Sequence, residues 1–195
     1  MKQIILDVET IRTFDEVGGY KPEKLGVSFV GAIERDGFDG KGKELEFFEN
    51  DLSKLWIILE SADVVVGFNT DGFDLPVLQP YYPGKITDLP SLDLMARIKD
   101  SVGHRISLDA VAMKTLGTQK SGNGLDAITY YQNGELDKLA QYCLKDVAIT
   151  RDIYDYGREK GVVKFLNRWN ELVEAPVDFS FEKKNDGTQM TLGGL

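Results

Sequence analysis

The segment that decides the fold is Ile4-Ile5-Leu6-Asp7-Val8-Glu9-Thr10, near the start of the chain. Its apolar residues predict a short buried strand over residues 2–8, in the centre of a sheet rather than at its edge. Asp7 and Glu9 lie two positions apart, so on a strand both side chains point to the same face. Two carboxylates this close repel each other unless a cation lies between them. A divalent-metal site is one interpretation, and an exposed strand face that carries charges by chance is the other.

A second acidic position follows a second predicted strand. The continuous apolar run from Ala62 to Phe68 is typical of a buried central strand, and Asp74 comes after the glycine-containing turn that follows it. Open α/β sheets usually bind ligands at this point of a strand. A helix N-cap is the alternative role for Asp74. Beside it, Asn69 offers an amide and Phe73 an aromatic face on which a nucleobase could stack.

The third segment lies on the most strongly periodic stretch of the chain, Leu136 to Lys160, which predicts a long helix. Tyr142 and Asp146 are four residues apart and therefore share one helix face. A phenol beside a carboxylate–metal cluster could orient an attacking water, and a core tyrosine bonded to a nearby acid is the alternative. All three segments occur in order, each on a suitable secondary-structure element. Because this combination is far less probable by chance than any one segment alone, it favours a metal-dependent phosphoryl-transfer site.

The remaining pattern predicts a mixed α/β sheet flanked by helices. Further strands are expected at Gly26–Ile33 and Glu44–Glu49, helices at Leu52–Ser61 (capped by Asp51 or Ser53), Phe73–Tyr82, Ser91–Lys99 and Ser107–Leu116, and a polar linker at Gly117–Gly124. We expect one domain over residues 1–180 and a flexible tail over residues 181–195.

Composition narrows the class of protein. No stretch approaches the roughly 18 apolar residues of a membrane span, and the chain starts without a basic leader. Cys143 is the only cysteine, which favours a reducing, cytoplasmic setting. The net charge of −9 argues against a protein that coats nucleic acid by charge alone. It does not exclude an enzyme that meets a strand end through bound cations.

Together the three segments resemble the three exonuclease motifs of the DEDD 3′–5′ exonuclease superfamily, which has a ribonuclease H-like fold. The resemblance covers roughly residues 1–160 and is closest to the proofreading exonuclease domain of family B DNA polymerases and its stand-alone relatives. The stretch Ser107–Gly117, with Lys120 after it, is also similar to the family between its second and third motifs. In the histidine branch a His lies five residues before the last Asp, but here Gln141 stands there. The resemblance is therefore to the tyrosine branch (DEDDy), and we expect His104 on the surface.

The resemblance implies a role for each site residue. Asp7, Glu9 and Asp146 would hold the metal that activates water, and Asp7 would bridge to a second metal supported by Asp74. The cofactors would be two Mg²⁺ or Mn²⁺ ions about 4 Å apart. Tyr142 would orient the water. The nucleic-acid-binding residues are expected to be Thr10, Asn69 and Phe73. Lys120 and Lys145 could contact phosphate, but solvated surface lysines are the expected alternative.

The implied reaction removes nucleoside 5′-monophosphates from the 3′ end of single-stranded DNA. An exoribonuclease and a non-catalytic nucleic-acid-binding module on the same fold are the alternatives. Because proofreading needs a polymerase, we expect a polymerase, helicase or sliding-clamp partner and a role in DNA repair. The segment Gln189–Leu195 resembles clamp-binding peptides in its Gln and in the aliphatic residue three positions later. It lacks their terminal aromatic residues, which favours a plain flexible tail.

Overall fold

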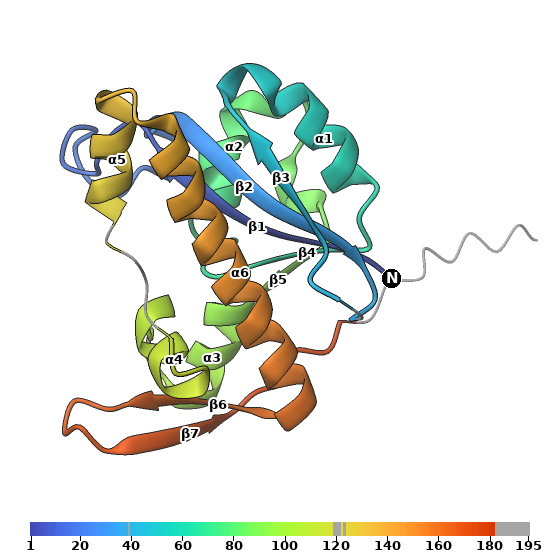
Figure 1. Ribbon diagram of the computed structural model, residues 1–195, viewed down its shortest axis with the longest axis vertical. Coiled ribbons are helices and arrows are strands. Elements are labelled where there is room, and N and C mark those ends of the chain that lie inside the picture. The colour runs from blue at the N-terminus through green and yellow to red at the C-terminus, as the bar shows by residue number, and fades with distance from the viewer. Residues whose placement is uncertain (39, 119–121, 123, 182–195) are drawn as a thin grey trace, which may run out of the picture.

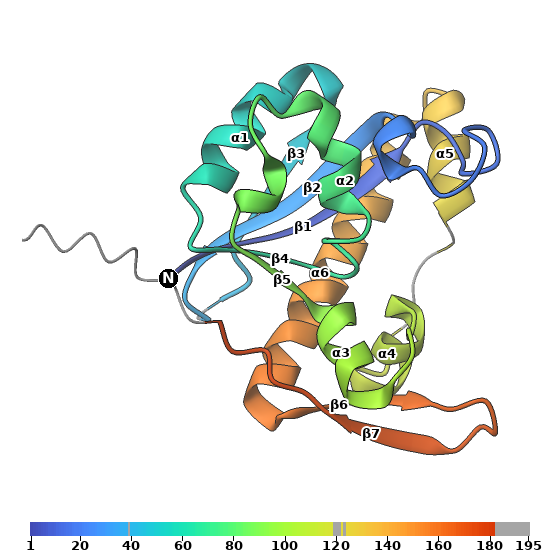
Figure 2. The same cartoon turned by 180° about the vertical axis from the view of Figure 1, so that it is seen from behind.

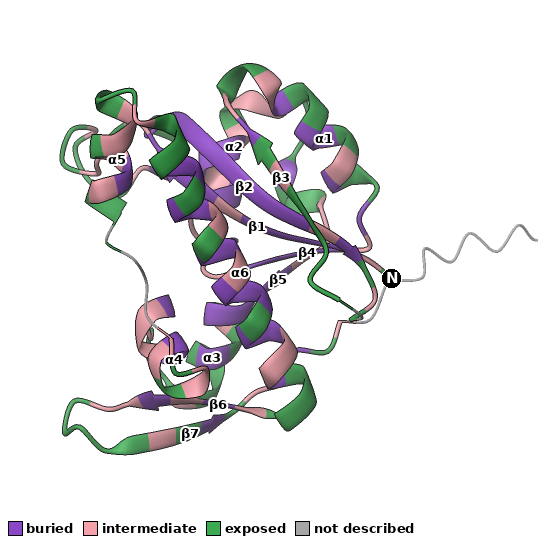
Figure 3. Ribbon diagram, in the orientation of Figure 1, coloured by how far each residue is buried: buried purple, intermediate pink, exposed green. Residues whose placement is uncertain are grey.

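The centre of the molecule is a five-stranded mixed sheet of strand order β3-β2-β1-β4-β5 (Figure 1). The computed structural model describes residues 1–38, 40–118, 122 and 124–181. The strands are β1 (Lys2–Thr10), β2 (Val27–Asp36), β3 (Lys43–Phe47), β4 (Val64–Gly67) and β5 (Ser91–Asp93). β1 pairs antiparallel with β2 and parallel with β4, so it is the central strand, as its apolar residues predict. Figure 3 shows that β1 and β2 are mostly buried.

Six helices and a separate hairpin surround the sheet within the described residues. The helices are α1 (Leu52–Glu60), α2 (Asp74–Leu78), α3 (Leu94–Val102), α4 (Leu108–Thr115), α5 (Gly124–Gln132) and α6 (Leu136–Lys160). The hairpin consists of β6 (Val162–Leu166) and β7 (Leu172–Pro176), and 3₁₀ turns occur at Pro22–Lys24, Glu49–Asp51, Gln79–Tyr81 and Ile86–Asp88. α1 and α2 cover one face of the sheet, and α6 crosses the other (Figures 1 and 2).

The alternation along β1 assigns its two faces. Ile4, Leu6 and Val8 pack into the core formed with α1 and α2. Ile5 packs into the core formed with α3, α4 and α6. Because successive strand residues point to opposite faces, Asp7 and Glu9 lie on the same face as Ile5, beneath α6. The acidic pair is therefore covered by the long helix rather than exposed to water by chance.

Some predicted elements need correction. The helix expected to begin at Ser91 begins at Leu94, since Ser91–Asp93 is strand β5. The helix expected over Phe73–Tyr82 divides into α2 and a 3₁₀ turn at Gln79–Tyr81. Neither α5 nor the β6–β7 hairpin is foreseen by the sequence pattern, and α5 begins where the polar linker was expected to end.

Two further expectations concern the residues that the structure does not describe and the absence of a membrane span. Lys120 and residues 182–195, which make up all but the first residue of the expected tail, lie outside the described residues. Helices of the length and apolarity that a bilayer crossing requires are absent from the described part of the chain.

Candidate active site

The first part of the site is the end of β1. Asp7 lies opposite Gly31 of β2, and Glu9 opposite Phe29, just before the ladder shifts register at Thr10. Asp7 is half-buried and Glu9 only 8% exposed. Such carboxylates are costly to desolvate unless they are paired, hydrogen-bonded or bound to metal. The strand thus fixes two acidic groups on the face that α6 covers.

The second part is the turn between β4 and α2, which a buried acid holds in place. The carboxylate of Asp93, at the end of β5, accepts hydrogen bonds from the backbone N–H groups of Asn69 (2.9 Å) and Asp71 (3.2 Å). It also accepts one from Ala96 N–H (3.1 Å), which caps α3. Asn69 has a positive φ of 72°, a left-handed conformation that Asn tolerates better than most residues. Asp93 thereby fixes both the turn and the next helix.

This turn delivers Asp74 to β1. The β1–β4 ladder ends at the Ile5–Val66 pair, so Val8 N–H has no β4 partner. Asp74 Oδ1 accepts the hydrogen bond from Val8 N–H at 3.1 Å. Burial, and then the nearby charge of Asp7, raise the pKa of Asp74 well above its usual range. The carboxyl therefore stands beside the β1 acids in an environment that disfavours an uncompensated negative charge.

The third part comes from α6. Asp146 is 1% exposed and Tyr142 5% exposed, so both predicted members of the helix face are buried. Between them in sequence, the Cys143 thiol lies 3.5 Å from the backbone oxygen of Asp7 and 3.6 Å from its Oδ2. Burial raises the pKa of that thiol well above its usual value, and the charges of Asp7, Glu9 and Asp146 also raise it. All three carboxylates therefore act on one buried atom, which shows that β1 and α6 bring them together.

The donor set fits a hard divalent cation. Ligand atoms of Asp7, Glu9 and Cys143 lie within 4.8 Å of one another. Asp74 lies outside this group, but it accepts the hydrogen bond from Val8 N–H, between Asp7 and Glu9, and the charge of Asp7 raises its pKa. Carboxylate oxygens are the ligands that Mg²⁺ and Mn²⁺ prefer. The thiol is protonated and buried, which suits packing better than ligation of these metals.

Two of the three predicted nucleotide-binding residues share a pocket. Thr10 and Phe73 line a hollow of about 450 Å³ at the end of β1, together with Arg12, Phe14, Leu125 and Ile128, among others. The Phe14 ring meets the Phe73 ring edge-on, with centroids 6.0 Å apart. A mainly apolar, aromatic-lined hollow beside the acids can receive a nucleobase. Neither Arg12 nor Phe14 stands out in the sequence, since each occurs in a polar loop without periodicity.

Asn69 does not line this hollow. Its side-chain Oδ1 accepts a hydrogen bond from Arg105 Nη2 at 2.6 Å. Arg105 is exposed and precedes α4, 36 residues further along the chain. The sequence offers no signal for this pair, whereas Asp93 could be found as an N-cap three residues before Ala96. His104, next to Arg105, is exposed, as expected.

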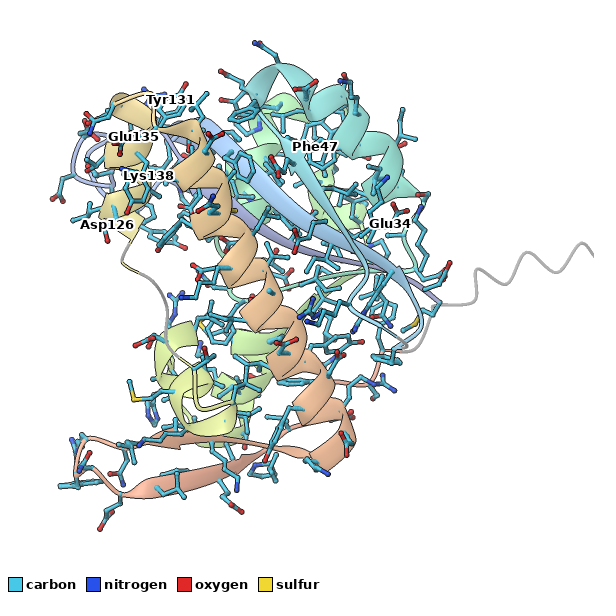
Figure 4. The ribbon with its side chains drawn as sticks, viewed as in Figure 1. Glu34, Phe47, Asp126, Tyr131, Glu135 and Lys138 are labelled. Carbon is cyan, nitrogen blue, oxygen red and sulfur yellow. The ribbon has the colours of Figure 1, made fainter. Side chains whose placement is uncertain are left out.

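Lysines flank the outer side of α6. Lys138, Tyr142 and Lys145 line a second hollow of about 390 Å³ with Tyr130 and Gln141. Figure 4 shows Lys138 near the start of α6, close to Glu135, and Asp126 on the neighbouring α5. Lys138 forms an ion pair with Glu135 at 2.9 Å, and Lys145 is exposed. Lys145 is therefore a surface residue, as expected.

Comparisons with known proteins agree with this fold. A family model described as RNase H superfamily matches residues 19–157. The family B DNA polymerase of the archaeon Pyrobaculum calidifontis superimposes with a TM-score of 0.59 and 19% identity, over 82% of this chain and 24% of that one. A complex of E. coli exonuclease I with single-stranded DNA gives 0.49 and 14%, over 82% and 41%. The chain thus spans less than half of either protein, and the match to the polymerase, at 19% identity, shows a shared fold alone. The search of curated proteins found no match.

Proposed function

The chain belongs to the RNase H superfamily, and from that premise we propose that it is a metal-dependent 3′–5′ exonuclease acting on single-stranded DNA. One observation carries the proposal. Acidic side chains from β1, α2 and α6 converge on one buried region, where the charges of Asp7, Glu9 and Asp146 all act on Cys143. Asp74, from the start of α2, lies close enough to Asp7 for that charge to raise its pKa, so the acids of three separate elements belong to one neighbourhood.

In the proposed site, Asp7, Glu9 and Asp146 would hold one divalent ion, and Asp7 and Asp74 a second. When bound, two such ions stabilise the attacking and leaving oxygens of an in-line displacement. Tyr142 would orient the water through its phenol. Hydrolysis forms a bond from the water oxygen to phosphorus and breaks the bond from phosphorus to the 3′ oxygen of the preceding nucleotide. The products are a nucleoside 5′-monophosphate and a strand with a new 3′-hydroxyl.

The hollow at the end of β1 supports an end-directed enzyme. Thr10 and Phe73 connect it to the acids, and its lining is mainly apolar. Stacking of a base on an aromatic ring tolerates every base, because each has a π-face. The terminal nucleotide would therefore be held without sequence preference. DNA is favoured over RNA by the resemblance of the three motifs to those of proofreading enzymes, and partners of the polymerase, helicase or clamp type remain part of the proposal.

The test is a time course on 5′-labelled single-stranded DNA and RNA of matched sequence, with Mg²⁺, Mn²⁺ or EDTA. We expect a ladder that shortens from the 3′ end, requires metal and is faster on DNA. Asp7→Ala should abolish it, and Tyr142→Phe should slow it about 100-fold, within the range for a positioned proton-transfer group. Asp36→Asn is the matched control, because that carboxylate is 86% exposed at the far end of β2. Full activity of Asp7→Ala would refute the site.

A further inference from the structure

The tip of the β6–β7 hairpin presents an aromatic side chain that the fold does not use. Trp169 is 66% exposed, and the Arg168 guanidinium lies 4.2 Å from the centroid of its ring. The tip is held by Asn167, whose Oδ1 accepts hydrogen bonds from Trp169 N–H (2.9 Å) and Glu171 N–H (3.0 Å). The indole is therefore displayed on an ordered turn, not carried on a loose one. In Figure 1 the hairpin runs beneath α3 and α4, and its tip projects beyond α4.

A series of contacts connects this tip to the candidate active site. Asn69, in the turn that positions Asp74, accepts the hydrogen bond from Arg105. The next residue, His104, places its ring edge-on to Phe165 of β6, with centroids 6.3 Å apart. Two residues after Phe165 the strand enters the tip that carries Arg168 and Trp169. The loop between α3 and α4 thus bridges the acidic site and the hairpin.

The route carries two guanidinium groups, those of Arg105 and Arg168. Neither Arg105 nor Arg168 forms a salt bridge within the described ranges, although acidic residues outnumber basic ones by 32 to 23. The acidic residues of the hairpin contact partners other than Arg168. Glu174 pairs with Lys164 at 2.7 Å, and Glu171 accepts a hydrogen bond from the Asn167 amide at 2.9 Å. Arg105 donates from Nη2 to Asn69 and from Nε to Met95 Sδ, which leaves its Nη1 to meet a phosphate. The Arg168 guanidinium, over the Trp169 ring, is the second cationic group on the way out of the site.

We propose that this route binds the single strand upstream of its 3′ end, with phosphates on Arg105 and Arg168 and a base stacked on Trp169. The inference rests on the proposed function, since it supplies the strand path that an end-directed nuclease needs. Aromatic side chains beside cationic groups are the usual elements of sequence-independent single-strand binding. A hairpin contact outside the acidic site makes affinity depend on strand length, because only a strand that reaches the tip gains the stack.

The experiment compares KM and kcat for a tetranucleotide and a DNA strand of about 20 nucleotides. For Trp169→Ala we expect KM on the long strand to rise about 5-fold or more, with kcat unchanged. KM and kcat for the tetranucleotide should both stay at their wild-type values. Trp169→Phe keeps a ring and should stay near wild type. Ile57→Ala is the matched control, since Ile57 is 70% exposed on α1, at the opposite end of the molecule from the hairpin (Figure 1).

Other results would overturn the path. Equal KM values for Trp169→Ala and wild type on the long strand, or equal losses at both lengths, would exclude a distal stack. If Trp169→Ala changes the sedimentation of the protein but not its affinity for DNA, the tip is a surface for protein contact instead. If wild type hydrolyses neither strand, the exonuclease proposal fails and anisotropy of the labelled long strand decides the path alone. Weaker binding by Trp169→Ala would then support it, and no binding by wild type would overturn it.

Discussion

Gly31 allows α6 to approach the sheet at the point where the site is built. It lies opposite Asp7 on β2, and a Cβ at this position would be 3.0 Å from Cys143 Sγ. The next nearest atoms are Val147 Cγ2 at 3.3 Å and Leu144 Cδ2 at 3.4 Å, close to ordinary contact. Gly31→Ala should therefore push Cys143, and with it the helix turn that carries Tyr142 and Asp146, away from β1.

The magnitude follows from two opposing effects. Overpacking a close contact costs about 1–3 kcal/mol. Replacing a mid-strand Gly by Ala regains about 0.5–1 kcal/mol of backbone entropy. We expect a net loss of about 0–2.5 kcal/mol in the free energy of unfolding. Because a misplacement of about 1 Å in an active site costs about 100-fold in rate, kcat should fall about tenfold for a shift of several tenths of an ångström.

A double-mutant cycle isolates the contact. In a Cys143→Ala background the sulfur is absent, so Gly31→Ala should be neutral or stabilising by about 0.5–1 kcal/mol. The coupling between the two sites would be about 1 kcal/mol or more, measured by urea unfolding with an unchanged m-value. Gly157→Ala is the control, because its Cβ would overlap the Phe179 ring, and Gly157 lies about 21 Å further along α6 than Cys143. It should lower stability and leave kcat unchanged. Additive free energies for Gly31 and Cys143 would refute the reasoning.

Three further predictions follow. Asp74 has a folded pKa above its unfolded value of about 4, so the metal-free fold loses stability as pH rises from about 4 through the folded pKa. Asp74→Asn should remove that loss, melting higher than wild type in EDTA at pH 7 and gaining less from Mg²⁺; a lower melting temperature in EDTA would contradict this. Asp93→Ala removes three hydrogen bonds from backbone N–H groups and should lower the urea-unfolding free energy by about 2–4 kcal/mol and reduce kcat. Asp155→Ala leaves the buried Arg35 guanidinium without its bidentate partner and should cost about 2 kcal/mol, with unchanged kcat if Asp155 is purely structural.

The elements predicted well are those whose pattern is long enough to be unambiguous. α6 runs from Leu136 to Lys160, as expected, because its apolar positions repeat over 25 residues and Gly161 ends it with a φ of 68°. β5 is only three residues long, and its apolar residues also suit the first turn of the helix that follows. The β6–β7 hairpin does carry a period-2 burial pattern, but two five-residue strands give a weak signal near the end of a chain.

For the site, too, the sequence predicts the relations between residues on one element, but not the contacts between residues far apart in the chain. The periods of 2 and 3.6 residues place Asp7 beside Glu9, and Tyr142 on the face of Asp146, whatever the tertiary fold. Bringing these pairs to Asp74 depends on topology, for which the resemblance was the only guide. The Asn69–Arg105 bond and the thiol beside Asp7 join residues 36 and 136 positions apart. No periodicity in a single sequence encodes such contacts.

The arrangement also explains why the site should be rigid before metal binds. The same helix that buries Asp146 and Tyr142 contributes Val147, Ile149 and Ile153 to the core against the sheet. The acids therefore cannot separate to relieve their repulsion without unpacking α6. Metal binding removes that repulsion in the folded state alone, so the cation should stabilise the fold in proportion to its occupancy. Core packing holds the acids close together in the metal-free protein, and their repulsion is thus a source of metal affinity. A substitution that loosens the packing of α6 should therefore lower both the stability of the fold and its affinity for the metal.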